Sequence, residues 1–467
     1  MQYICSAFIH ATSSVERKIN FSTATSVVIA NMVGTGVFTS LGFQLFGIND
    51  FATLMFLWLL GGIISLFGAF AYAELGAALP KSGGEYNFLS KIFHPSIGFL
   101  SGWISATIGF AAPIALAASA LAKYTNTVFS IDEKLLGVGI ILLITIFQSV
   151  NYKIGGTFQT IVTSLKVLLI AVFIIAGLFF TKSEAGISFL PTDMTFTKAG
   201  IFSAAFATSM FYVAFAYSGW NASSYIAGEI INPKRNIPRS LFMGTAIVTV
   251  LYVLVNFVFL KTTPVDEMRG QVEVGFVSGN YIFGADGAKV VSMIISLLLV
   301  STISAMVIAG PRVISAIGND FSVFKIAAKT NKSGIPVIAI WLQSAIAIAL
   351  LLTGSFSTIL NYTTFVLILF GTLTVAGVIV LRMKNPNLER PYKCWGYPIT
   401  PLLFIIPNCW FLFYALKSDK DAYANWQFWF EDFSKVPPTF IGILIVLVGA
   451  LVYLFAKNFS TPNSTKN

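Results

Sequence analysis

The stretch FYVAFAYSGWNASSYIAGEI, residues 211–230, is apolar at both ends and interrupted in the middle. Its centre, AYSGWN (216–221), places small polar residues and a glycine where a helix interior is weakened by them. A membrane helix that breaks at mid-depth frees backbone N–H and C=O groups, and protein, trapped water or a ligand must satisfy them. The stretch therefore predicts either a binding site or an unusually tight helix contact inside a membrane.

The composition predicts a protein that crosses the membrane many times. Of the 467 residues, 56% are hydrophobic and 10% are charged, and the mean hydropathy is +0.81. A soluble chain of this length does not bury so much apolar surface. Apolar runs of about 18 or more residues can each cross a bilayer as a helix. Twelve spans are predicted, at 21–46, 51–79, 96–124, 135–151, 157–181, 198–230, 239–261, 286–318, 335–353, 357–381, 396–416 and 437–457.

The charge distribution predicts the orientation of the chain. With both termini in the cytoplasm, most of the 29 Lys and Arg residues fall in inner segments and most of the 19 acidic residues in outer ones, as the positive-inside rule requires. The net charge of +10 thus reflects topology, and no nucleic-acid partner is expected. Residues 1–20 and 458–467 are predicted to be cytoplasmic, and the longest outer loop, 262–285, is too short for a soluble domain.

The first span contains a second interruption, NMVGTGVF (31–38). Spans one and six are the first members of two successive sets of five. Interrupted helices at matching places in two halves are typical of inverted-repeat transporters, whose binding site lies at the breaks. The alternative is tight helix packing, for which membrane helices also use small residues.

The polarity of the two breaks fits an α-amino acid. The half-helix that begins at Gly34–Gly36 directs N–H groups, and the positive end of its dipole, at the gap, where they suit a carboxylate. The half-helix that ends at 215–218 offers free carbonyl groups, which suit an ammonium group. Neither break contains a charged side chain.

The chain resembles the amino acid–polyamine–organocation superfamily of transporters over almost its full length. The resemblance rests on VGTGVF (33–38), AYAELGAALPKSGGEY (71–86), FAYSGWNASSYIAGEIINPKRNIPRS (215–240), GPRV (310–313) and RMKNPNLERPY (382–392). It implies an all-α membrane protein that works by alternating access around a central amino-acid site. The implied ten-helix core has two inverted repeats, 21–181 and 198–381, followed by two accessory helices in 396–457.

The resemblance also implies the roles of individual residues around the breaks. The substrate carboxylate is expected on Met32, Val33, Gly34, Thr35 and Gly36. The amine is expected on main-chain oxygens of Phe215, Ala216 and Ser218, with the Phe215 ring as a lid or as an ordinary core aromatic. Trp220 and Asn221 occupy positions where exchangers of this family often have the same pair, and Asn31 either lines the pocket or makes a helix-packing hydrogen bond.

Lys166 is the most informative ionisable residue because it lies about 13 Å into the fifth span, near the middle of a roughly 30 Å hydrocarbon core. It is either functional or snorkels to the surface. Desolvation favours a neutral amine, which can exchange a proton. In sodium-independent members of the superfamily that this chain resembles, a lysine on the fifth span occupies the place where related transporters bind sodium. The match implies proton coupling or sodium-free exchange.

Further polar residues are candidates for the pocket or for an inner gate. Ser301 and Thr302 could line the pocket or bond to their own helix, and Met306 could shape the side-chain subsite. Glu74, Glu229 and Arg312 fall near inner ends and could form a gate of ion pairs or cap structure, whereas a structural role is preferred for Glu85.

A neutral amino acid is the expected substrate, because spans three, eight and ten carry no acidic residue at mid-depth. An exchanger that includes cationic substrates is the alternative, and a non-transporting sensor is a third reading. No enzyme motif and no metal or cofactor site is expected: His10 and His94 stand apart, and neither H-E-x-x-H nor G-x-S-x-G occurs. The low charge, the many Phe and Lys residues and the short loops are typical of a bacterial inner-membrane protein.

Overall fold

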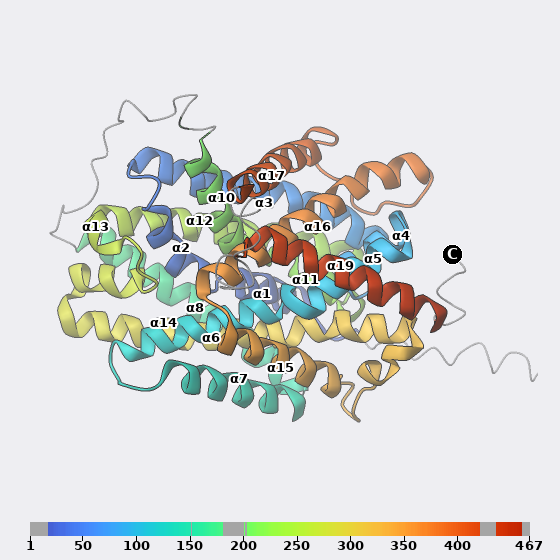
Figure 1. The fold of residues 1–467 in the computed structure, drawn as a ribbon, viewed down its shortest axis with the longest axis horizontal. Helices are drawn as coiled ribbons and strands as arrows, with labels where there is room; N and C mark the ends of the chain where they lie inside the picture. The colour runs from blue at the N-terminus through green and yellow to red at the C-terminus, as the bar shows by residue number, and fades with distance from the viewer. Residues whose placement is uncertain (1–16, 151, 181–199, 201–202, 421–435, 460–467) are drawn as a thin grey trace, which may run out of the picture.

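The computed structural model describes residues 17–150, 152–180, 200, 203–420 and 436–459. Most of the predicted cytoplasmic segments 1–20 and 458–467 lie outside these ranges. Within them the chain forms helices and connecting turns and no strand. Many of the helices run along the longest axis of the molecule, as expected of a membrane bundle (Figure 1).

The helices follow the predicted spans closely. Their bounds, in chain order, are α1 (Phe21–Met32), α2 (Gly36–Gln44), α3 (Phe51–Ala78), α4 (Glu85–Ile92), α5 (Pro95–Ile104), α6 (Ala111–Asn126), α7 (Glu133–Val150), α8 (Tyr152–Phe179), α10 (Ala204–Tyr217), α11 (Ala222–Tyr225), α12 (Pro233–Thr262), α13 (Val265–Met268), α14 (Val274–Asp320), α15 (Val337–Thr353), α16 (Phe356–Lys384), α17 (Ile399–Ser418) and α19 (Pro438–Ala456).

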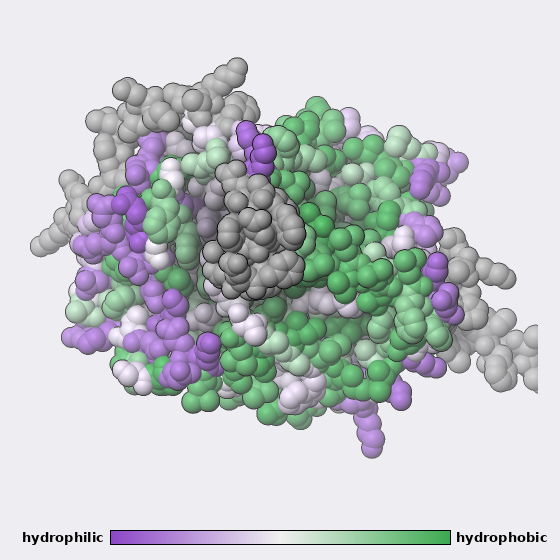
Figure 2. Space-filling view, in the orientation of Figure 1, coloured by the Kyte–Doolittle hydropathy of each residue, from purple (hydrophilic) through white to green (hydrophobic). Residues whose placement is uncertain are grey.

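The described helices are those of an integral membrane protein. Ten helical segments are long and apolar enough to cross a bilayer, and the shorter apolar helices α10 and α15 occupy the positions of predicted spans six and nine. The surface agrees with this assignment, because a broad apolar area separates two ends of the molecule where hydrophilic residues gather (Figure 2). The predicted all-α membrane fold is confirmed.

Both predicted interruptions are present. In the first span the backbone leaves the helix at Val33, whose ψ of 81° is not helical, and the helix resumes at Gly36. In the sixth span α10 ends at Tyr217, and Gly219 adopts φ +93°, a conformation that side-chain-bearing residues rarely take. This local glycine chemistry explains why the breaks could be predicted from the sequence.

Two features differ from the predictions. The third span contains a π-helical turn, Ser105–Gly109, between α5 and α6, although its apolar sequence predicts an uninterrupted helix. The predicted outer loop 262–285 is largely helical, because α13 lies within it and α14 begins at Val274. α14 kinks at Gly284, where φ is +74°, so glycine again permits the change of direction.

Candidate functional site

The two breaks pack directly against each other. A Cβ atom on Gly36 would lie 2.3 Å from the Cα atom of Ala216, and one on Gly219 would lie 2.9 Å from the backbone of Asn31. Real Cβ atoms do not approach so closely. The glycines therefore allow the two irregular backbones to touch, as the packing alternative expects, and they bring both predicted binding segments together.

Tyr252 of α12 links the two breaks, although sequence analysis did not single it out. Its hydroxyl lies 2.5 Å from the carbonyl oxygen of Met32 and 3.1 Å from that of Ala216, and its single proton is shared between these two acceptors. The side chain is buried. A tyrosine hydroxyl in an apolar span needs a hydrogen-bond partner, and that requirement is the signal that could have identified it.

Lys166 of α8 holds the break of the first span from the other side. Its ammonium or amine Nζ donates to the carbonyl oxygen of Val33 at 2.7 Å and to Oγ1 of Thr302 at 2.8 Å. Thr302 also donates to Val33, at 2.9 Å. Lys166 is fully buried, so it does not snorkel to the surface. No carboxylate within the described ranges forms an ion pair with it.

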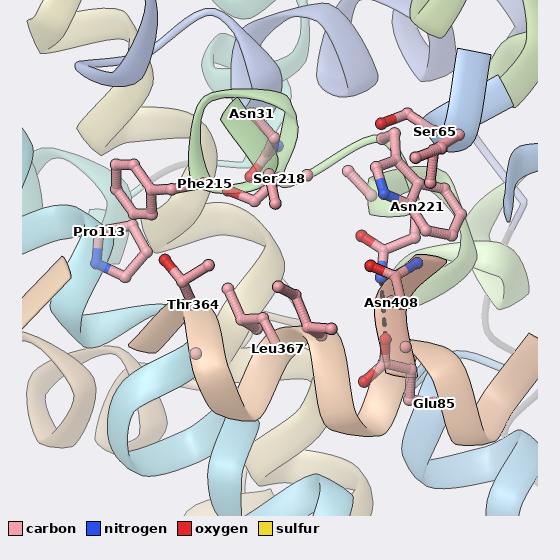
Figure 3. A pocket seen from close by; sticks show the side chains of 18 of the residues that line it. Asn31, Ser65, Glu85, Pro113, Phe215, Ser218, Asn221, Thr364, Leu367 and Asn408 are labelled. Atoms are coloured by element: carbon pink, nitrogen blue, oxygen red, sulfur yellow. Dashed lines mark hydrogen bonds between the residues drawn. The ribbon is translucent and has the colours of Figure 1, made fainter. Parts of the chain in front are cut away.

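A cavity of about 100 Å³ adjoins the two breaks. It is bordered by segments of α1, α3, α6, α10, α11, α14, α16 and α17, by the first residue of α4, by the π-helical turn and by the loop between α10 and α11 (Figure 3). The predicted site residues that line it are Asn31, Phe215, Ser218, Trp220, Asn221 and Met306. The remaining predicted residues near the breaks, which are Met32, Val33, Gly34, Thr35, Gly36, Ala216, Lys166, Ser301 and Thr302, do not belong to its lining.

Asn31 and the predicted amine-binding carbonyl groups already have internal partners. Asn31 lines the cavity, and its Nδ2 donates to the carbonyl of Val27 in its own helix at 2.8 Å, not to a neighbouring helix. The carbonyl oxygen of Phe215 accepts from the amide of Ser218 at 3.0 Å. Each carbonyl oxygen has a second lone pair, so a bound ammonium group remains possible beside these bonds.

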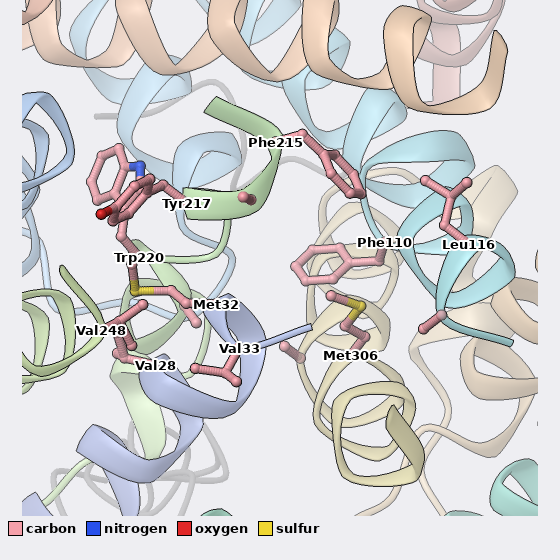
Figure 4. Packing of buried hydrophobic residues seen from close by; sticks show 14 of the residues in the cluster. Val28, Met32, Val33, Phe110, Leu116, Phe215, Tyr217, Trp220, Val248 and Met306 are labelled. Carbon is pink, nitrogen blue, oxygen red and sulfur yellow. The ribbon is translucent and has the colours of Figure 1, made fainter. Parts of the chain in front are cut away.

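An aromatic wall closes one side of the cavity. Phe110, which follows the π-helical turn, lies near Phe215 and Met306 (Figure 4) and packs edge-on against Tyr225 at 5.0 Å between ring centroids. π-Helical turns are frequent at functional sites. Nothing distinguished Phe110 among the 44 phenylalanines of the sequence, because its role follows from the unpredicted turn.

Glu85, the first residue of α4, brings a carboxylate to the other end of the cavity. It accepts hydrogen bonds from Tyr72 Oη at 2.5 Å, Asn221 Nδ2 at 3.1 Å and Ser101 Oγ at 3.4 Å. The Tyr225 hydroxyl also faces it, through Asn221. None of these groups is a cation, and burial raises the pKa of Glu85 to about 7. Glu85 therefore supports the loop, as expected, and also lines the cavity.

The predicted gate residues form two separate clusters. Arg312 Nε pairs with Glu229 at 3.1 Å. Glu74, in contrast, pairs with Arg382 at 2.6 Å and with Arg390 at 3.3 Å. The trio Glu74, Glu229 and Arg312 is therefore not a single network. The backbone of Glu229 additionally accepts from the amides of residues 18 and 19, which ties the start of the first span to the end of the sixth.

Three aromatic rings stack on the side of the breaks that the predicted topology makes outer. Phe43 of α2 stacks on Tyr212 of α10, with ring centroids 5.5 Å apart, and on Phe356 of α16, at 6.0 Å. The three rings join α2, the second half of the first span, to spans six and ten. They lie on the predicted outer side, whereas the cavity extends to Glu85 in the predicted inner loop.

Comparisons with known proteins agree with these features. The sequence profile of the family described as amino acid permease matches residues 19–465. The chain is 28% identical to the serine/threonine exchanger SteT of Bacillus subtilis, over 87% of this chain and 93% of the exchanger. It is 28% identical to the mouse large neutral amino acids transporter small subunit 2, over 94% and 81%. It is 27% identical to the mouse b(0,+)-type amino acid transporter 1, over 82% and 79%.

Proposed function

Because this chain belongs to the amino acid permease family, we propose that it moves a neutral α-amino acid across the membrane by alternating access, coupled to protons and independent of sodium. Amino acid transport is the activity of its relatives. The observation that carries the finer proposal is the contact between two helix breaks beside a cavity. A bacterial inner membrane, with both termini cytoplasmic, is the proposed location.

The substrate's charged groups are proposed to bind to backbone rather than to side chains. Within 32–36, the amides of Val33 and Gly34 already donate to the carbonyls of Ile29 and Met32. The amides of Thr35 and Gly36, at the start of α2, lack intrahelical acceptors and would hold the carboxylate. The carbonyl oxygens at 215, 216 and 218 would hold the ammonium group. Phe215 would cover the substrate from the aromatic wall. One relative is named for large neutral amino acids and another for serine and threonine, which supports a neutral substrate.

Lys166 is proposed to carry the coupling proton. A neutral amine has two N–H donors and an ammonium group has three. The arrangement around Nζ provides two acceptors, Val33 O and Thr302 Oγ1, which matches the neutral amine. Taking up a proton therefore requires a further acceptor, and movement of the break at 33–35 could provide one. Protonation of Lys166 and movement of the first span would then occur together.

Opening is proposed to alternate between the aromatic stack at Phe43 and the inner pair of Glu229 and Arg312. Amino-acid exchange is the alternative mode, since one relative is named an exchanger, and a sensor is the third. Uptake of radiolabelled amino acids into liposomes, with and without an inward proton gradient and internal amino acid, separates them. Gradient-driven accumulation supports symport, uptake only against internal amino acid supports exchange, and binding without uptake supports a sensor.

A further inference from the structure

We propose that Ser65, Glu85, Asn221 and Asn408 form a side-chain subsite that takes the hydroxyl or amide group of a neutral polar amino acid. The subsite rests on the proposed function, because it assumes that the α-amino and α-carboxylate groups bind at the breaks. It narrows the substrate class from neutral amino acids in general to those with a hydrogen-bonding side chain.

Asn408 is the residue that points most directly to a ligand. It lies on α17, outside the ten helices of the predicted core, yet its side chain lines the cavity. Its Nδ2 donates to the carbonyl of Phe404 at 2.8 Å. Within the described part of the chain its amide oxygen accepts no hydrogen bond, and it faces the cavity rather than the packed core. Because the side chain lines the cavity, a water molecule or a ligand donor there can reach this oxygen, which still has its acceptor lone pairs.

Ser65 and Glu85 add further acceptor capacity beside Asn408. Ser65 Oγ uses its proton on the carbonyl of Gly61 at 2.8 Å, which leaves its oxygen lone pairs for a ligand. Glu85 accepts three protein donors, and a carboxylate has about four lone-pair sites. The subsite therefore has more acceptors than donors, and the chemically matching ligand group is an O–H or N–H donor.

The position of the subsite suits the side chain of an amino acid held at the breaks. Figure 3 shows Asn31, Phe215 and Ser218 grouped in one region of the cavity, and Ser65, Asn221, Asn408 and Glu85 grouped in another. Leu367 of α16 lies along the wall between the two groups. A substrate anchored at the breaks would extend past this apolar wall and place its polar end in the subsite.

The charge of the subsite favours a neutral ligand over a cationic one. The side chains that donate to Glu85, which are Tyr72, Ser101 and Asn221, are all neutral, so no cation among them holds it in the ionised form. Burial raises the pKa of Glu85 to about 7, which favours the neutral carboxylic acid more than in an exposed glutamate. A hydroxyl or amide can bond to either form, because both forms retain acceptor lone pairs, whereas an ammonium side chain needs the ionised one.

Threonine and valine test the subsite because they have almost the same shape and differ in the hydroxyl. In proteoliposomes, kcat/KM for threonine is expected to exceed that for valine at least tenfold, since a site built to bond a hydroxyl rejects the analogue that lacks it. Asn408→Leu should bring the ratio close to one. Asn256→Leu is the matched control: Asn256 makes the same bond to the carbonyl four residues earlier, at 2.8 Å, but does not line the cavity, so the ratio should persist.

Ser65→Ala repeats the test with the loss of a single atom, in case Asn408→Leu does not fold. Equal transport of threonine and valine by the wild type overturns the subsite and leaves the proposed function intact. Stronger competition by lysine than by threonine overturns the assignment to neutral substrates. If no amino acid is transported or raises the melting temperature of the purified protein, both the subsite and the proposed function are wrong.

Discussion

Replacement of Lys166 by methionine tests the proposed coupling. If one proton enters with each amino acid, a gradient of one pH unit supplies about 1.4 kcal/mol, which sustains about tenfold accumulation of substrate. Lys166→Met has no group that can carry the proton, so accumulation should fall from about tenfold to the equilibrium value of about one. Exchange of labelled for unlabelled substrate, which needs no net proton movement, should persist.

The contacts of Lys166 indicate that the variant keeps its fold. Methionine resembles the lysine stem in length and is apolar, so it can occupy the same buried space. The variant loses two hydrogen bonds, to Val33 and Thr302, but the bond from Thr302 to Val33 at 2.9 Å remains. The net cost is about 1–3 kcal/mol, and it is partly offset because no amine has to be buried.

The assay is uptake into liposomes with pH 6 outside and pH 7 inside, compared with pH 7 on both sides. Lys123→Met is the matched control, since Lys123 is a partly buried lysine at the end of α6, away from the breaks. It should accumulate substrate as the wild type does. Tenfold gradient-driven accumulation by Lys166→Met would refute the assignment of the proton to Lys166.

Three other substitutions test the site. Gly36→Leu should abolish substrate binding, because a Cβ would lie 2.3 Å from Ala216, whereas Gly139→Ala, where a Cβ meets open space, should bind normally in a thermal-shift assay. Tyr252→Phe should destabilise the protein by about 1–3 kcal/mol and weaken substrate affinity, since the carbonyls of Met32 and Ala216 lose their shared donor. A variant whose melting temperature with saturating substrate equals that of the wild type would contradict this. Glu85 has a pKa of about 7 when folded and 4.5 as the ordinary value, so between these pH values the folded state holds a proton that the unfolded state has released. The wild type should therefore lose stability relative to Glu85→Gln as pH rises from 4.5 to 7, by up to about 3 kcal/mol, and parallel melting curves across that range would exclude the shift.

The breaks and the spans could be predicted because their causes are local in sequence. Gly34, Gly36 and Gly219 interrupt apolar runs that are otherwise long enough to cross a membrane. Lys166 could be singled out because a lysine at mid-depth is rare. The structure adds what its amine binds, which no spacing rule determines.

The rest of the site depends on helix packing between distant segments. Tyr252 and Asn408 each look like an isolated polar residue in an apolar span, and only the fold brings one to the breaks and the other to the cavity. Glu85 lies in a loop by sequence but reaches the cavity because α4 packs back against α5. Glu74 was grouped with Arg312 because both lie near inner ends, whereas packing pairs it with Arg382.

Transport by the purified protein in liposomes tests the central proposal most directly. A panel of labelled neutral amino acids would be offered with an inward proton gradient, to the wild type and to Gly36→Leu in parallel. The proposed site at the facing breaks predicts gradient-driven accumulation by the wild type and none by the variant, whose Gly139→Ala control transports normally. Equal accumulation by the wild type and Gly36→Leu would show that the breaks are not the substrate site.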